Sequence, residues 1–369
     1  MPGAYESLPA WTYSDPDFFR EEMDAVIRPA WQLVCHRNDI PEVGDYITLD
    51  ILNERLVAVR DAEGSIRVFH NVCRHRGSRL LEGQSGSCPG RIRCPYHAWT
   101  WDLEGALVNV PYEKDFAGFD RTDHGLAVAE SCEYLGFVWA RLLPGGPSIE
   151  EQFSPYIDEI SHYRFEEMQP LGRVTLRPRA VNWKQIADNY ADALHIPVAH
   201  PGLSGLVGNS YGMEVKGDIH KMWGDVMESR KDSWSTRAYK KHLPVVPHLP
   251  EHLRRHWCYY RLWPNVAFDV YPDQIDFMQF IPVSATETMI REIAYVLPDD
   301  RREMKAARYL NWRINREVNA EDTVIINRVQ DGMGSSSFDT GPLAKTEVCL
   351  LDSVRRIREA VPSANAPKP

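Results

Sequence analysis

The sequence predicts an α+β protein, with a small antiparallel β domain near the N-terminus and a larger domain that mixes helices and strands. Between residues 39 and 143, short runs of alternating apolar and polar residues are separated by Gly, Pro, Asn and Asp, as in antiparallel strands. Beyond the linker-like segment 144–147, helical and strand-like patterns mix. At 369 residues the chain is long enough for two domains. We therefore expect a β domain over residues 40–148 and a second domain from residues 1–39 and 149–369.

Local signals place the individual elements. Ser14-Asp15-Pro16 starts an amphipathic helix within residues 9–31. The β domain contains five strand-like runs, at 46–52, 56–61, 65–72, 106–110 and 136–142. The second domain is expected to have strands at 173–181, 260–271, 274–283 and 288–297, a helix at 182–195 and a long helix at about 300–330.

Composition excludes several classes of protein. A net charge of −10 argues against general nucleic-acid binding, and no apolar run approaches the ~18 residues that would span a membrane. The N-terminus lacks the pattern of a signal peptide, so we expect a cytoplasmic location. The seven cysteines are an odd number scattered along the chain, which favours thiols or metal ligands over a disulfide framework.

Two pairs of possible metal ligands lie in loops of the β domain: Cys73-x-His75 and Cys94-x-x-His97. A Cys2His2 zinc site is one interpretation, because zinc accepts the same ligands. Zinc fingers, however, usually pair Cys with Cys and His with His, whereas each loop here offers one of each. In a Rieske [2Fe–2S] cluster one iron takes both thiolates and the other iron both imidazoles. The spacing therefore favours a Rieske cluster over zinc.

A second set of ligands lies in the larger domain. On the expected helix, Asp188, Asp192 and His195 share one face, and Pro197 should break the helix so that His200 turns back toward His195. Asp322 falls on the apolar stripe of the long helix, where a carboxylate is costly unless it is paired or bound to a metal. Glu321 and Asp331 are rival carboxylates that fit the stripe less well. His195, His200 and Asp322 would form the 2-His-1-carboxylate triad of non-haem Fe(II) enzymes.

Five arginines surround the first set of ligands in an otherwise acidic protein: Arg74, Arg76, Arg79, Arg91 and Arg93. A cationic rim at a redox centre would attract an acidic electron carrier such as a ferredoxin. Solvated surface charge is the alternative interpretation.

Taken together, these motifs resemble the oxygenase (α) component of Rieske non-haem iron oxygenases. The resemblance runs through NVCRHRG, CPYHAWTWD, NWKQIADNYADALHIPVAH and AEDTVIINRVQDGM, and covers nearly the whole chain. It implies that Cys73, His75, Cys94 and His97 bind the cluster, and that His195, His200 and Asp322 bind mononuclear Fe(II). It further implies a helix-grip (START/SRPBCC-like) fold for the second domain and a homotrimer. In that trimer Asp192 would carry electrons from His97 of a neighbouring subunit to His195, with Asn189 beside the iron ligands.

The same resemblance implies O2 as co-substrate and electrons from NADH. Because the chain has no GxGxxG fingerprint, NADH would be oxidised by a separate reductase, with a ferredoxin or that reductase as the partner. The favoured reaction is N- or O-dealkylation of an aromatic or xenobiotic compound, as in the chloroacetanilide N-dealkylase branch. Ring hydroxylation by a dioxygenase and oxidation of a quaternary amine are the alternatives. A non-enzymatic electron-transfer or zinc protein would leave the second domain unexplained.

The second domain also offers aromatic and aliphatic candidates for the substrate pocket, although each could equally be core packing. They are Leu203, Val207, Tyr211, Met222, Trp223, Phe268, Tyr271, Phe277 and Met278.

Overall fold

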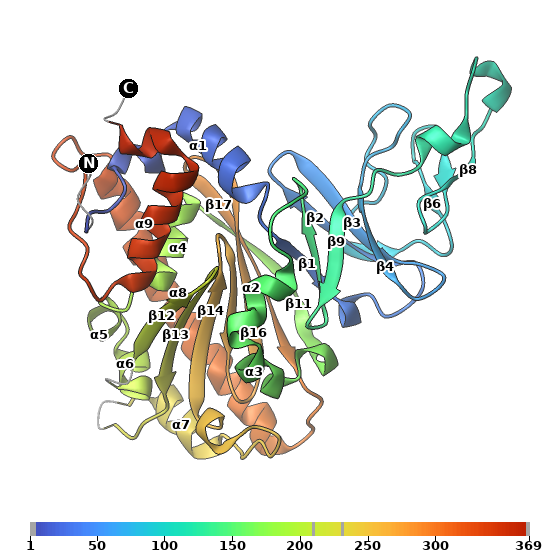
Figure 1. Cartoon of the computed structure of the whole chain (residues 1–369). Coiled ribbons are helices and arrows are strands. Elements are labelled where there is room, and N and C mark those ends of the chain that lie inside the picture. Colours follow the sequence, from blue (N-terminus) through green and yellow to red (C-terminus); the bar gives the residue numbers. More distant parts are fainter. Residues whose placement is uncertain (1–4, 209–210, 230–231, 367–369) are drawn as a thin grey trace. The chain divides into compact units, whose positions relative to one another are not determined.

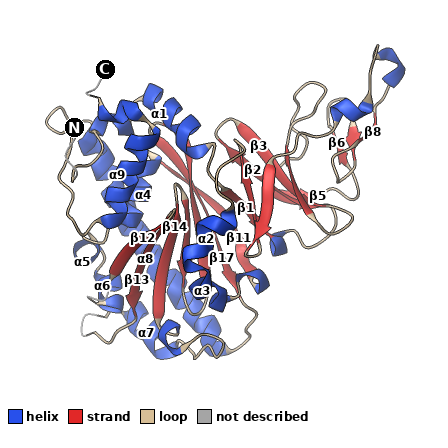
Figure 2. Ribbon diagram, in the orientation of Figure 1, coloured by secondary structure: helices blue, strands red, loops and turns tan. Residues whose placement is uncertain are grey.

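The computed structural model describes residues 5–208, 211–229 and 232–366. These residues form two compact units. The smaller unit comprises residues 28–149 and 165–170, and the larger comprises the described residues up to 27 together with 150–164 and those from 171 onward. Helices and antiparallel sheets both contribute, so the predicted α+β class is confirmed (Figure 2).

The smaller unit consists of three short antiparallel sheets (Figure 1). The first has the order β1-β10-β9, formed by Gln32–His36, Phe137–Arg141 and Glu130–Tyr134. The second has the order β4-β3-β2-β5, formed by Ile66–His70, Glu54–Arg60, Asp45–Ile51 and Ser85–Ser87. The third has the order β6-β7-β8, formed by Ile92–Arg93, Thr100–Trp101 and Leu107–Asn109. All five strands predicted for this region coincide with observed strands.

The larger unit is built on a seven-stranded sheet with the order β11-β17-β16-β15-β14-β13-β12. Its strands are Gln169–Arg179, Glu287–Val296, Ile275–Ser284, Val266–Val270, His256–Leu262, Ile219–Asp225 and Gly212–Lys216. The helices are α1 (Pro16–Glu22), α2 (Ile149–Phe153), α3 (Ile157–Ile160), α4 (Trp183–Ala191), α5 (Ile196–Ala199), α6 (Pro201–Val207), α7 (Trp234–His242), α8 (Arg302–Met333) and α9 (Val348–Ala360).

Helix α8 packs on one face of this sheet, as a helix-grip fold requires (Figure 1). Its residues Ala307, Leu310 and Ile314 share a buried cluster with Trp257 and Tyr259 of β14. Because the long helix lies against the sheet, side chains from both elements can face the same interior space. None of the described helices combines the length and the apolar character needed to cross a membrane.

The helix predicted over residues 182–195 is wrong in its last four residues. Helix α4 ends at Ala191, and Asp192 has extended backbone angles (φ −94°, ψ 138°). The Asp192 carboxylate accepts the backbone N–H groups of Leu194 and His195, which replaces the hydrogen bonds that would continue the helix. Pro197 does not break α4; it lies in the first turn of α5, where its missing N–H costs nothing.

Two other predicted elements are subdivided. The run 260–271 is not one strand, because β14 ends at Leu262 and β15 begins at Val266. Pro264 lies between them and cannot donate a hydrogen bond within a central strand. The expected helix within 9–31 is a 3-10 turn (Ala10–Tyr13), then α1, then a π-helical turn (Met23–Ile27).

Candidate metal centres and substrate pocket

The loops that carry Cys73 and Cys94 have the same pattern of backbone hydrogen bonds. In the first loop the Cys73 N–H donates to the Ser78 carbonyl (2.8 Å) and the Gly77 N–H to the Cys73 carbonyl (3.0 Å). In the second loop the Cys94 N–H donates to Trp99 (2.8 Å) and the Ala98 N–H to Cys94 (3.1 Å). Gly77 (φ 71°) and Ala98 (φ 58°) close the turns in the left-handed region, which glycine adopts freely and alanine rarely does.

The four predicted cluster ligands come together at these loops. The two thiols interact with each other, and the rings of His75 and His97 lie 4.7 Å apart between centroids. His75 stacks on Trp99 (4.8 Å, 7°), which fixes the direction of its ring. The buried Nδ1 atom of His75 has no hydrogen-bond partner, as expected for a nitrogen that binds a metal.

The geometry favours a two-iron cluster over zinc. A tetrahedral ion with ligand bonds of about 2.0–2.3 Å would draw its ligand atoms within about 4 Å of one another. No three of these four described residues bring their ligand atoms within 4.8 Å of one another. The two thiols differ in their electrostatics: the N–H groups of His97 and Tyr96 outweigh burial and lower the pKa of Cys94, whereas burial raises the pKa of Cys73.

The second predicted ligand set also converges. The ligand atoms of His195, His200 and Asp322 lie within 4.8 Å of one another. His195 Nε2 is 3.1 Å from His200 Nε2 and 3.6 Å from Asp322 Oδ1, and His200 Nε2 is 2.9 Å from the same oxygen. Two imidazoles and one carboxylate facing a common point fit a non-haem iron and leave coordination positions for O2 and substrate.

Three neighbouring side chains hold these ligands. Asp192 Oδ2 lies 2.8 Å from His195 Nδ1, and the Asn189 amide donates to Asp322 Oδ1 at 3.1 Å. Glu321, a rival ligand in the sequence, instead lies 2.7 Å from Nδ1 of His200, the nitrogen that faces away from the site. Asp188 does not join the group, because its carboxylate accepts a hydrogen bond from Tyr13 (2.7 Å).

A pocket with an empty volume of about 830 Å³ opens at this second ligand set. Tyr190, Tyr211 and Tyr259 supply aromatic surface, and Asp269 supplies a carboxylate. The hydroxyls of Tyr190 and Tyr271 donate to the two oxygens of Asp269 at 2.6 and 3.2 Å. Burial raises the pKa of Asp269 to about 7.

The sequence located this pocket only in part. Of the nine candidates, Leu203, Tyr211 and Met278 line it. Phe277 lines a neighbouring pocket, while Val207, Met222 and Tyr271 belong to the buried core. Phe268 is also buried, and Trp223 is not part of the pocket wall. Tyr190, Tyr259, Asp269 and Arg179 were missed, although an aspartate inside the apolar run VAFDVY was a usable signal.

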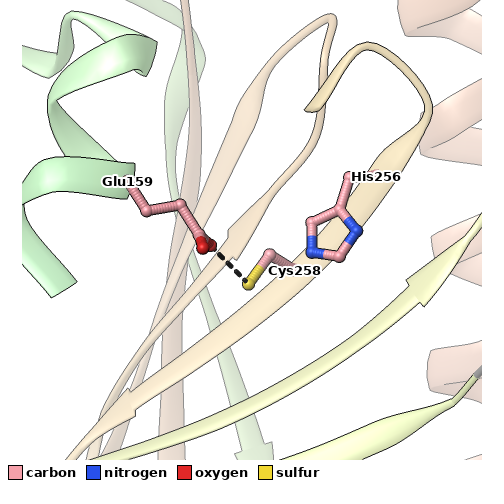
Figure 3. A group of neighbouring side chains, drawn as sticks. All are labelled: Glu159, His256 and Cys258. Atoms are coloured by element: carbon pink, nitrogen blue, oxygen red, sulfur yellow. Dashed lines mark hydrogen bonds between the residues drawn. The ribbon is translucent and has the colours of Figure 1, made fainter. Parts of the chain in front are cut away.

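Another group of possible ligands, Glu159, His256 and Cys258, lies at α3 and β14 (Figure 3). The Glu159 carboxylate already forms an ion pair with the Lys221 ammonium at 2.8 Å. Cys258 Sγ lies 3.7 Å from the other oxygen of the same carboxylate. His256 is engaged by Asp225 at 2.8 Å. Burial raises the pKa of the Cys258 thiol, which keeps it protonated. With a lysine already serving as counter-ion, this group is a structural ion-pair cluster.

Residues 165–363, just over half of the chain, match the family model "Ring hydroxylating alpha subunit (catalytic domain)". The chain belongs to this family. In this ring-hydroxylating α subunit, residues 30–122 also match the Rieske [2Fe-2S] domain. The prediction of a Rieske oxygenase α component is therefore confirmed, together with its two cofactors, a Rieske cluster and mononuclear iron that works with O2.

Relatives of this α subunit are named for quaternary amines. The carnitine monooxygenase oxygenase subunit of Escherichia coli K12 is 35% identical over 200 residues, which is 54% of this chain and about half (53%) of the relative. The subunit of Acinetobacter pittii is 27% identical and covers 89% of this chain and 87% of its own. The solved quaternary ammonium Rieske monooxygenase CntA with L-carnitine has the same fold (TM-score 0.80, 23% identity, 96% of each chain). The predicted aromatic or xenobiotic dealkylation therefore finds no support.

Proposed function

We propose that this α subunit is the terminal oxygenase of a quaternary-ammonium monooxygenase, using O2 and electrons that originate from NADH. The observation that carries the proposal is the pocket at His195, His200 and Asp322, where tyrosine rings and a buried carboxylate line one space. The relatives named for carnitine and glycine betaine support the same substrate class.

The pocket is complementary to a permanent cation. Aromatic faces attract ammonium groups, and the attraction reaches about 2 kcal/mol where water is excluded. Among the described residues, no lysine or arginine forms an ion pair with Asp269. A substrate cation would supply the missing counter-charge, whereas a neutral aromatic compound would leave this carboxyl group without a counter-ion.

Arg179 gives the same pocket a site for an anion. Arg179 lines the pocket, one Nη donates to the Pro178 carbonyl at 3.1 Å, its buried Nε has no hydrogen-bond partner, and no described carboxylate forms an ion pair with it. A carboxylate at the other end of the substrate could therefore bind here, in the bidentate way arginine favours. Carnitine and glycine betaine each carry both groups, so we propose a zwitterionic substrate.

Residues of this chain would hold the metal and orient the substrate. His195, His200 and Asp322 would hold Fe(II), which activates O2 when bound, and Asn189 keeps the Asp322 carboxylate oriented. The tyrosines and Asp269 would hold the ammonium so that a neighbouring C–H bond faces the metal. Hydroxylation of a carbon bonded to nitrogen gives an unstable product that separates into an aldehyde and an amine.

Electrons would enter through the smaller unit. Arg74, Arg91 and Arg93 are exposed at the cluster loops and can meet an acidic carrier. Arg79 is engaged with Asp50 at 2.8 Å and is a poorer candidate. We propose that the chain forms a homotrimer in which Asp192 links His195 to His97 of a neighbouring copy. A related solved structure is described in terms of inter-subunit electron transfer.

A product screen tests the proposal. The oxygenase, reconstituted with a reductase and NADH, is offered carnitine, glycine betaine, choline and a neutral N-methyl aromatic compound. The expected result is amine and aldehyde formed from a quaternary-ammonium compound, with NADH consumed in step. Turnover of the neutral aromatic compound alone would overturn the substrate class.

A further inference from the structure

Two adjacent acidic residues of α8 hold His200 from opposite ends of its ring. Asp322 Oδ1 lies 2.9 Å from Nε2, and Glu321 Oε2 lies 2.7 Å from Nδ1. Consecutive helical residues point about 100° apart, so this pair can reach two sides of one imidazole. The His200 side chain is 1% exposed, which leaves it little freedom to rotate.

We propose that Glu321 is a positioning residue for the metal centre: it holds His200 with its proton on Nδ1 and thereby presents the Nε2 lone pair to the metal. A neutral imidazole carries one N–H, and the tautomer is set by the partner of the other nitrogen. A carboxylate on the non-ligating nitrogen also makes the ligating nitrogen a stronger donor.

The geometry separates this role from that of a metal ligand. The Glu321 oxygen lies at the nitrogen that faces away from His195 and Asp322, so Glu321 cannot share a metal ion with His200 Nε2. The Glu321 side chain is 30% exposed, so its hydrogen bond to His200 does not depend on deep burial of the carboxylate.

Glu321 also differs from Asp192, which contacts Nδ1 of the other histidine. The Asp192 carboxylate contacts the His195 ring and also accepts two backbone N–H groups. Asp192 is also the proposed route for electrons. Glu321 contacts His200, the other candidate histidine ligand, and is not part of the proposed electron route. Its loss should therefore weaken metal binding and leave electron transfer from the cluster intact.

The test measures metal binding directly. In anaerobic protein stripped of the mononuclear metal, Co²⁺ affinity is measured by competition with a chelator for the parent, Glu321→Ala and Glu321→Gln. Glu317→Gln, an exposed position one turn earlier on α8, is the matched control. Loss of a carboxylate behind a ligating histidine typically costs about 10–100-fold in affinity. We expect that loss in Glu321→Ala, a smaller one in Glu321→Gln, whose amide oxygen still accepts the Nδ1–H, and none in the control.

Spectra distinguish positioning from general damage. The Rieske EPR signal should be unchanged in every variant, while the visible spectrum of bound Co²⁺ should change in Glu321→Ala. Unchanged affinity and spectrum in Glu321→Ala would overturn the proposal. If that variant does not fold, Glu321→Gln decides: weaker Co²⁺ binding with an intact Rieske signal supports the role, and parent-like binding contradicts it. None of these outcomes depends on the identity of the substrate.

Discussion

The Tyr190 hydroxyl donates a 2.6 Å hydrogen bond to Oδ1 of Asp269, a buried carboxyl group in the pocket wall. Tyr190 directly follows Asn189, whose amide contacts the iron-ligand candidate Asp322. One stretch of α4 therefore supports both the proposed metal centre and the proposed cation site. The predictions below follow from this arrangement.

Replacing Asp269 should weaken cation binding selectively. Asp269→Asn keeps a polar group of similar size but removes the charge, and loss of one partner of a buried charge pair typically costs 2 kcal/mol or more. We expect Kd for a quaternary-ammonium substrate to rise by about 30-fold or more at pH 8, measured by calorimetry. The neutral isostere 3,3-dimethylbutanol serves as the control, and an equal loss for both ligands would argue against a charge effect.

The affinity for the cation should depend on pH. Burial raises the pKa of Asp269 to about 7, so below that pH the carboxyl group is protonated and its charge is lost. Kd should therefore increase about tenfold for each pH unit below about 7 and level off above it. The same titration of Asp269→Asn should be flat, and a parallel slope in that variant would assign the pH dependence to another group.

Replacing Asp192 should separate metal content from turnover. Asp192→Asn can still accept hydrogen bonds from Leu194 and His195, so both metal centres should remain filled. Turnover should nearly vanish, because the proposed link to His97 of a neighbouring subunit loses its charge. In a single-turnover experiment the reduced cluster should remain reduced when O2 and substrate are added. Reoxidation at the parent rate would exclude Asp192 as the bridge.

Charge reversal at the exposed rim should slow reduction of the cluster. Arg91→Glu and Arg93→Glu are expected to lower the rate with an acidic carrier and to reduce its dependence on salt. The measurement is stopped-flow absorbance of the Rieske centre. Arg79→Glu is the comparison, because Arg79 already pairs with Asp50 and should contribute less to the outward field. Salt profiles of Arg91→Glu and Arg93→Glu that match the profile of the parent would show that the rim does not attract the carrier.

The residues of both candidate metal sites could be named from the sequence, but most of the pocket could not. Cys73, His75, Cys94 and His97 are paired at short spacing, and local loop geometry brings each pair together. Asp322 was recognisable because a carboxylate on an apolar stripe needs a partner. For Glu321, one residue away, the sequence predicts only a rival ligand, because sequence does not show which nitrogen of His200 an acid reaches.

The pocket residues come from distant elements whose pairing is set by the tertiary fold. Tyr190 lies on α4, Tyr259 on β14 and Asp269 on β15, and only the packed sheet and helices make them neighbours. The wrong prediction at Asp192 has a local cause instead of a tertiary one. Its side chain captures two backbone N–H groups and ends α4 early, a competition that helical periodicity alone does not reveal.

A matched pair of compounds tests the central claim most directly. Choline and 3,3-dimethylbutanol have nearly the same shape, but only choline carries the cationic nitrogen. O2 uptake coupled to product formation is measured for each with the fully reconstituted oxygenase, with carnitine as a zwitterionic reference. The account predicts coupled turnover of a quaternary-ammonium compound and none of the neutral isostere. Turnover of the neutral isostere at a rate equal to that of choline or carnitine, or coupled turnover of neither choline nor carnitine, would contradict it.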